Sequence, residues 1–212
     1  MAKPRFPRMR RIIEAVVAFL LLIIQYVPVV GIWHGVMFFP LAVYIFSLLA
    51  VHPESFGTDA NFLLFSTYNM FGRVVALCGI ILFLGAFIQF LKTRGKLITK
   101  GVYSVVRHPQ YLGIIILTFG YSFMVIQVTA SPYPIEIVQQ VLFIWLIQVF
   151  GYIALAFYEE RCLSKEYGTE YEQYKNKVPF IFPVSHTRRI PEPIFSFILT
   201  LIVVFLCILL LV

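Results

Sequence analysis

Six long apolar runs constrain the fold of this chain more than any other feature. They cover residues 12–30, 36–51, 74–91, 112–128, 135–157 and 194–212. A helix needs roughly 20 apolar residues to cross a bilayer core, so most of these runs are long enough to span it. The runs are continuous rather than alternating, which favours helices over a barrel. We therefore predict an all-α, polytopic transmembrane bundle of five to six spans, the number depending on the short run 36–51, which contains Pro40.

Composition excludes a water-soluble fold, because 60% of the 212 residues are hydrophobic and only 13% are charged. The first apolar run follows a basic arm, as a secretory signal would. It has no small-residue cleavage pattern after it, so we expect it to be a retained span.

The net charge of +7 indicates contact with membrane lipids. Basic residues gather in the N-terminal arm and in residues 92–107, which suits anionic headgroups at the cytoplasmic face. We do not expect a nucleic-acid partner. Cys78, Cys162 and Cys207 are scattered, without a CxxC or a His/Cys cluster, so we expect neither a disulfide framework nor a metal site. The sequence does not specify an oligomeric state.

Polar chemistry is concentrated in two segments, residues 92–111 and 158–189. One apolar hairpin separates them, so both should lie at the same membrane face, which the basic residues suggest is cytoplasmic. We expect N-terminal helices in residues 1–91, a catalytic, cofactor-binding core in 92–193 and a C-terminal helix in 194–212. The spacing of Thr169 and Glu172 predicts a capping box, with a short helix starting at Thr169 after an interruption at Gly168.

Each polar segment carries residues suited to ligand binding. Pro109 fits the first turn of the following helix and would present Arg107 and His108 at the membrane mouth, where free backbone amides can bind an anion. Glu159 and Glu160 follow a long apolar run, and carboxylates there are costly unless they meet cations, donors or a positively charged ligand. The two segments could therefore form one pocket. Each segment taken alone has an ordinary explanation. Arg107 and His108 could anchor a loop to lipid headgroups, and Glu159 and Glu160 could mark where a helix leaves the membrane.

Taken together, the two segments carry a recognisable pattern. It reads G-x-Y-x-x-x-R-H-P-x-Y-x-G over residues 101–113, then one helical hairpin, then E-E-x-x-L-x-x-x-Y-G-x-x-Y-x-x-Y and V-P-x-x-x-P up to Pro183. This pattern resembles the membrane methyltransferases that include isoprenylcysteine carboxyl methyltransferase and phospholipid N-methyltransferases. The resemblance implies S-adenosylmethionine as cofactor and a lipophilic acceptor, either an isoprenylcysteine carboxylate, a phospholipid amine or another small lipophilic nucleophile.

The resemblance also implies which residues form the site. The cofactor candidates are His108, Tyr111, Leu112, Gly113, Glu159, Glu160, Leu163 and Tyr171. Arg107 would lie nearer the substrate, and His108 or Glu160 could handle a proton during catalysis. Gly113 has a second interpretation, since a small residue also permits close helix packing.

Two other functions compete with methyl transfer. The C-terminal part of membrane sterol reductases shares an Arg-His-Pro-x-Tyr-x-Gly stretch and a Tyr-Gly and Val-Pro ending, and those enzymes use NADPH. The Glu159-Glu160 pair favours methyl transfer. The other alternative is a non-catalytic membrane partner or small transporter. Few other intramembrane charges, apart from Arg73, are available to line a transport path.

Overall fold

The computed structural model describes residues 36–53, 65–93, 96–129, 135–184 and 190–211. The chain divides into two compact units, Met1–Phe39 and Pro40–Val212, and the contacts described below all belong to the second. The predicted first span and its basic arm lie outside the described residues, as do residues 130–134, which connect the two apolar runs of the predicted hairpin.

The described part of the chain is helical and contains no strand. Its α-helices are α3 (Phe39–Val51), α6 (Met70–Lys92), α7 (Pro109–Thr129), α8 (Ile135–Tyr167), α9 (Thr169–Lys175) and α10 (Glu192–Leu211), with short 3-10 helices η1 (Thr67–Asn69) and η2 (Gly101–Ser104). By length and composition α6, α7, α8 and α10 can each cross a membrane, whereas α3 has only 13 residues. The prediction of an all-α transmembrane bundle is confirmed.

Helices α6 and α7 approach each other so closely that side chains are excluded from the seam between them. A Cβ on Gly79 would lie 2.3 Å from the backbone nitrogen of Leu117, and one on Gly120 would lie 2.4 Å from the carbonyl oxygen of Gly72. A Cβ on Gly113 would lie 2.6 Å from the backbone nitrogen of Phe83. Inside a bilayer the hydrophobic effect does not drive helices together, so close packing at small residues is a main source of helix association. Gly113 therefore packs against α6.

The short helix α3 is joined to the bundle by buried polar contacts. Its Tyr44 hydroxyl donates to the carbonyl of Thr118 at 3.0 Å and lies 2.8 Å from the Ser122 hydroxyl on α7. Pro40 packs against Gly151 of α8, where an added Cβ would lie 3.0 Å away. In the absence of water, such hydrogen bonds hold helices together because the alternative is an unsatisfied polar group.

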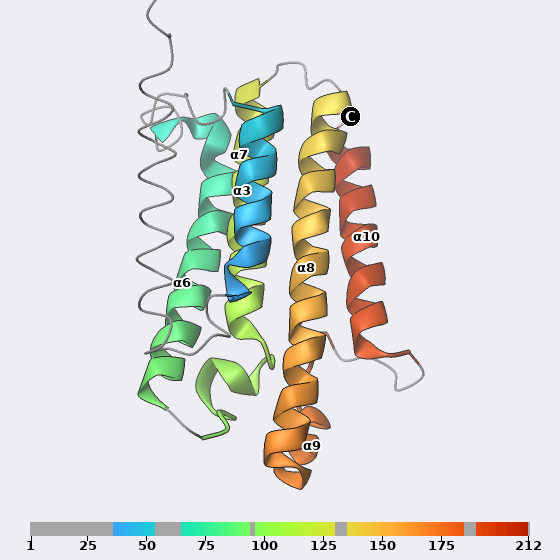
Figure 1. Cartoon of the computed structure of the whole chain (residues 1–212). Coiled ribbons are helices and arrows are strands. Elements are labelled where there is room, and N and C mark those ends of the chain that lie inside the picture. The colour runs from blue at the N-terminus through green and yellow to red at the C-terminus, as the bar shows by residue number, and fades with distance from the viewer. Residues whose placement is uncertain (1–35, 54–64, 94–95, 130–134, 185–189, 212) are drawn as a thin grey trace, which may run out of the picture. The chain divides into compact units, whose positions relative to one another are not determined.

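The two polar segments meet at one end of the bundle, where α9 lies beside the tip of α8 (Figure 1). As predicted, α7 begins at Pro109. Helix α8 continues to Tyr167, so Glu159 and Glu160 lie two turns inside the helix rather than at its exit. Because α8 is the longer helix, it carries these carboxylates alongside the residues that precede α7.

The transition from α8 to α9 corrects one sequence prediction. A short helix does start at Thr169, but its N-cap is Gly168 with φ of 53°, and no side-chain cap is formed. Glu172 instead accepts a hydrogen bond from the Ser164 hydroxyl at 2.8 Å. The predicted capping box is wrong because Gly168, which tolerates the left-handed region, already makes the turn and leaves Glu172 facing α8.

The α6–α7 seam predicts a position-dependent effect of adding one methyl group. Gly79→Ala should destabilise the bundle by about 1–3 kcal/mol, because the new Cβ meets the α7 backbone, which cannot move aside without opening the seam. Gly85→Ala on the same helix is the control, since a Cβ there meets nothing within 4 Å. It should stabilise α6 by about 0.5–1 kcal/mol. Unfolding in mixed detergent micelles measures both variants, and equal effects would contradict the seam.

Candidate functional site

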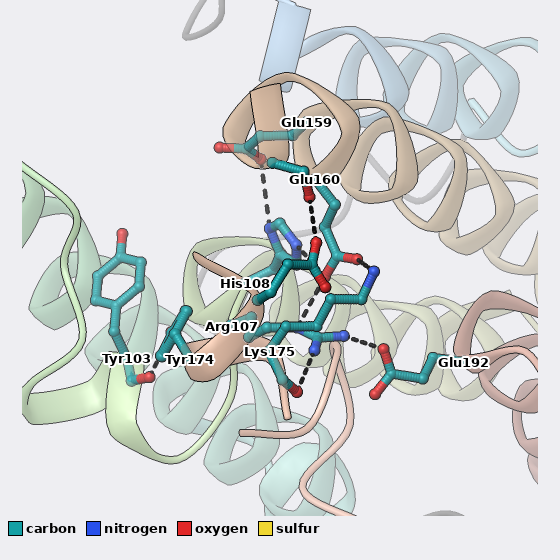
Figure 2. A network of polar contacts seen from close by, with 10 residues as sticks. Tyr103, Arg107, His108, Glu159, Glu160, Tyr174, Lys175 and Glu192 are labelled. Atoms are coloured by element: carbon teal, nitrogen blue, oxygen red, sulfur yellow. Dashed lines mark hydrogen bonds and ion pairs between the residues drawn. The ribbon is translucent and has the colours of Figure 1, made fainter. Parts of the chain in front are cut away.

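Arg107 joins three separate elements at the polar end of the bundle (Figure 2). Its side chain is 1% exposed, and its Nε lies 2.7 Å from Oε1 of Glu160 on α8. Its Nη1 donates to the carbonyl of Lys175 on α9 at 2.8 Å. Its Nη2 donates to the carboxylate of Glu192, in the first turn of α10. Each nitrogen of the guanidinium thus contacts a protein acceptor, and the fork geometry of arginine makes this possible.

His108 lies between the two adjacent carboxylates of α8. Its Nδ1 is 3.3 Å from Oε2 of Glu159, and its Nε2 is 3.5 Å from Oε1 of Glu160. Its ring stacks on that of Tyr111 with centroids 5.5 Å apart, and the Phe180 ring meets it edge-on. The imidazole is contacted at both nitrogens and by two aromatic rings, so its orientation is set by the surrounding fold.

The segment after α9 fixes the backbone of the Arg-His-Pro motif. The Arg107 amide donates to the carbonyls of Pro179 at 2.9 Å and Phe180 at 3.1 Å, and the His108 amide donates to Phe180 at 3.3 Å. Nearby, the Tyr174 hydroxyl donates to the Tyr103 carbonyl at 2.6 Å. These contacts explain why a Val-Pro segment about 70 residues away belongs to the same sequence pattern.

The charges of the site nearly balance. Glu159, Glu160 and Glu192 face Arg107 and Lys175, whose Nζ lies 3.3 Å from Oε2 of Glu160. Three carboxylates against two permanent cations leave one negative charge when His108 is neutral. Burial by itself lowers the pKa of His108, but hydrogen bonds and charge from Glu159 and Glu160 outweigh it, so the pKa is raised above its usual value. A proton on His108 would therefore neutralise the cluster.

The structure gathers most of the residues that the sequence predicted for the site. Arg107, His108, Tyr111, Glu159 and Glu160 lie together through the contacts described above. Tyr171 is buried, and this burial, followed by the charge of Glu160, raises the pKa of its hydroxyl. Leu112 is buried as well.

Two predicted site residues face other surroundings. Gly113 packs in the α6–α7 seam, where the backbone of Phe83 occupies the space beside it. Leu163 packs against the apolar cluster of Tyr171, Tyr174 and Val178, which supports α9. Gly113 therefore lies at a helix-packing contact, which was the second interpretation of this residue. Leu163 supports α9, the helix that carries Tyr171.

Sequence analysis missed Lys175, Glu192 and Phe180. Lys175 contributes through both its carbonyl and its ammonium group. The available signal for Glu192 was a carboxylate between two prolines at the start of an apolar run. Such a residue is also typical of a helix N-terminus, so only its contact with Arg107 distinguishes the two roles. Within the described residues, no group of three or more His, Cys, Asp or Glu side chains could hold a metal ion.

Comparison with known proteins places this site in a family. The chain belongs to the family described as "Protein of unknown function (DUF1295)", whose sequence model matches residues 2–178. Protein-S-isoprenylcysteine O-methyltransferase B of Arabidopsis thaliana is 28% identical over 117 residues, which are 53% of this chain and 54% of that protein. A probable protein-S-isoprenylcysteine O-methyltransferase of Oryza sativa subsp. indica is 37% identical over 90 residues, 41% of this chain and 42% of that protein.

These matches confirm the resemblance to the membrane methyltransferase superfamily. This chain spans about half the length of the curated relatives it matches. No solved structure matches it significantly.

The raised pKa of His108 predicts a pH dependence of stability. Because the folded state binds the proton more tightly, this contribution is complete below about pH 6.5, the usual value for histidine, and is lost as pH rises through the raised pKa. Thermal unfolding between about pH 6 and pH 9 should show the decline in the wild type. In His108→Gln the same decline should be absent, and an unchanged pH profile would contradict the assignment.

Proposed function

We propose that this protein is an integral membrane methyltransferase that moves a methyl group from S-adenosylmethionine to a lipophilic acceptor. The observation that carries the proposal is the meeting of Glu159, Glu160, His108 and Tyr111 at the start of α7. The names of the relatives support the same chemistry, since one is named a protein-S-isoprenylcysteine O-methyltransferase and the other a probable one.

The residues at this end of the bundle fit the chemical groups of that cofactor. Glu159, whose side chain is 29% exposed, offers a carboxylate to an ammonium or to ribose hydroxyls. The side-chain oxygen of Gln110 is buried and accepts no hydrogen bond from the described residues. The first amides of α7 can donate to a carboxylate. Tyr111 provides aromatic surface for a sulfonium, and the carboxylates favour a cationic ligand.

S-adenosylmethionine, when bound, supplies an activated methyl whose bond to sulfur is exchanged for a bond to the acceptor while the electron pair stays on sulfur. The protein's task is to orient the reactants and exclude water. Arg107 and Lys175 hold Glu160, and Glu160 and Glu159 hold the His108 ring. His108 can accept a proton at a ring nitrogen when the acceptor is an amine or thiol, whereas a carboxylate acceptor has none to lose.

We place the site at the cytoplasmic face. Helix α6 ends at Lys92, and the polar segment that follows includes Lys96 and Lys100, close in sequence to Arg107. An excess of lysine and arginine in short loops is typical of the cytoplasmic side.

Binding of S-adenosylhomocysteine tests the cofactor assignment. Isothermal titration calorimetry of the full chain in lipid nanodiscs should give saturable binding of S-adenosylhomocysteine and none of NADPH. Glu159→Gln should weaken the affinity by about tenfold, because a charged acceptor is replaced by a neutral amide. Glu166→Gln is the matched control, since this exposed glutamate lies two turns further along α8 and should leave the affinity unchanged.

Binding of NADPH without S-adenosylhomocysteine would favour the reductase alternative, and binding of neither would favour a non-catalytic role. A screen of membrane lipid extracts with methyl-labelled S-adenosylmethionine then identifies the acceptor. Arg107→Lys should lower turnover in that screen, because lysine keeps the charge but cannot contact Glu160, Glu192 and the Lys175 carbonyl simultaneously.

A further inference from the structure

Glu192 differs from the other two acceptors that surround Arg107. The carbonyl of Lys175 is part of the α9 backbone and stays in place. Glu160 is 5% exposed and is also held by Lys175 and His108. Glu192 is 15% exposed and comes from α10, beyond the family-matched residues 2–178. Of the two carboxylates on Arg107, Glu192 is the one closer to the surface.

The immediate surroundings of Glu192 are apolar. Glu192 lines a small hollow of about 10 Å³, partly open to the outside, together with Phe180, Phe182, Val184, Phe195 and Ser196. Three phenylalanines and a valine make its wall largely apolar, and Phe180 also touches the guanidinium of Arg107 with 5.5 Å between its ring centroid and Cζ. Phe180 and Glu192 thus line the hollow and also contact Arg107.

The positive charge of Arg107 limits which ligands can replace Glu192. Without Glu192 the Nη2 of Arg107 loses its acceptor, and a buried charged donor without an acceptor is costly. A neutral ligand that displaced Glu192 would incur this cost, whereas a carboxylate or phosphate would restore the pair. Exchange of one anion for another is therefore the inexpensive way to open this end of the site.

We propose that Glu192 occupies the position of an anion belonging to the methyl acceptor. The acceptor is then an amphiphile whose carboxylate or phosphate displaces Glu192 from Arg107 and whose apolar chain runs along the phenylalanine side chains beside Glu192. The acceptor role of this amphiphile rests on the proposed function, whereas anion binding at Arg107 does not. Glu192 is in this sense a specificity-determining residue, since it competes with every acceptor and is displaced most readily by an anionic one.

A purely structural role for Glu192 predicts the opposite sign. If Glu192 served only to position Arg107, Glu192→Gln would weaken the binding of acceptors. If Glu192 is a competitor, the same variant strengthens the binding of anionic amphiphiles, because Arg107 loses a rival partner. The direction of the change separates the two roles.

The experiment measures binding of dodecanoate, dodecyl phosphate and dodecanol to the full chain in phosphatidylcholine nanodiscs. In Glu192→Gln the two anions should bind about tenfold more tightly than in the wild type, equivalent to about 1.4 kcal/mol of lost competition. Dodecanol should be unaffected. Glu192→Asp retains the charge and should behave like the wild type. Glu136→Gln is the matched control, since Glu136 is an exposed first-turn glutamate of α8.

Equal or weaker binding of both anions in Glu192→Gln overturns the proposal, as does an equal gain for dodecanol. A gain for only one anion identifies the carboxylate or the phosphate as the group recognised. S-adenosylhomocysteine binding is measured in the same samples. Its absence from the wild type would contradict the proposed methyl transfer but would leave the anion result standing.

A measurement on the wild type covers the case in which Glu192→Gln does not fold. The Phe195 amide donates to the Pro191 carbonyl at 3.0 Å in the first turn of α10. Displacement of Glu192 should loosen this turn, so saturating dodecyl phosphate should speed amide hydrogen exchange at Ile194, Phe195 and Ser196. Unchanged exchange at saturation counts against displacement.

Discussion

The buried ion pair between Arg107 and Glu160 is the interaction on which the polar end of this protein depends. It joins the segment before α7 to a glutamate two turns from the C-terminal end of α8, with 2.7 Å between the charged atoms. Neither charge could remain in such surroundings alone, because removing an ion from water costs several kcal/mol unless partners compensate. Lys175, His108 and Glu192 complete this compensation, so α8 and α10 are each paired with Arg107, and α9 is paired with Glu160 through Lys175.

Helix packing away from the site positions the elements that carry its residues. The glycine seam brings α7 against α6, while α3 is tied to α7 through Tyr44. These contacts leave one side of α7 for α8, and Trp145 of α8 donates to the Ile115 carbonyl at 3.2 Å. With α7 and α8 aligned in this way, Glu159 and Glu160 meet His108 at the point where α7 begins. The position of the site thus follows from helix packing as much as from its own polar contacts.

The features of the site that could be predicted depend on neighbouring residues in the sequence. The features that could not be predicted depend on contacts between helices. Pro109 marked the start of α7, and a motif resemblance brought Arg107, His108, Glu159 and Glu160 forward as candidates. The Thr169–Glu172 capping box was wrong, since two helix signals, a glycine and a threonine, competed at one boundary. Gly113 had two interpretations, cofactor contact and packing, and spacing alone could not separate them. The distance to Phe83 on another helix shows how tightly it is packed.

The amino-acid sequence alone determined that this chain forms apolar helices, that its charges gather in two segments and that those segments lie at one end of the bundle. Length, hydrophobicity and the hairpin connection are local properties, so they can be read without coordinates. Only the tertiary structure decided that Arg107 is saturated by protein acceptors and that one of them is Glu192, 85 residues away. The physical reason is that a buried arginine must be neutralised by whichever carboxylate the packing brings near, and sequence patterns do not encode which helix that will be.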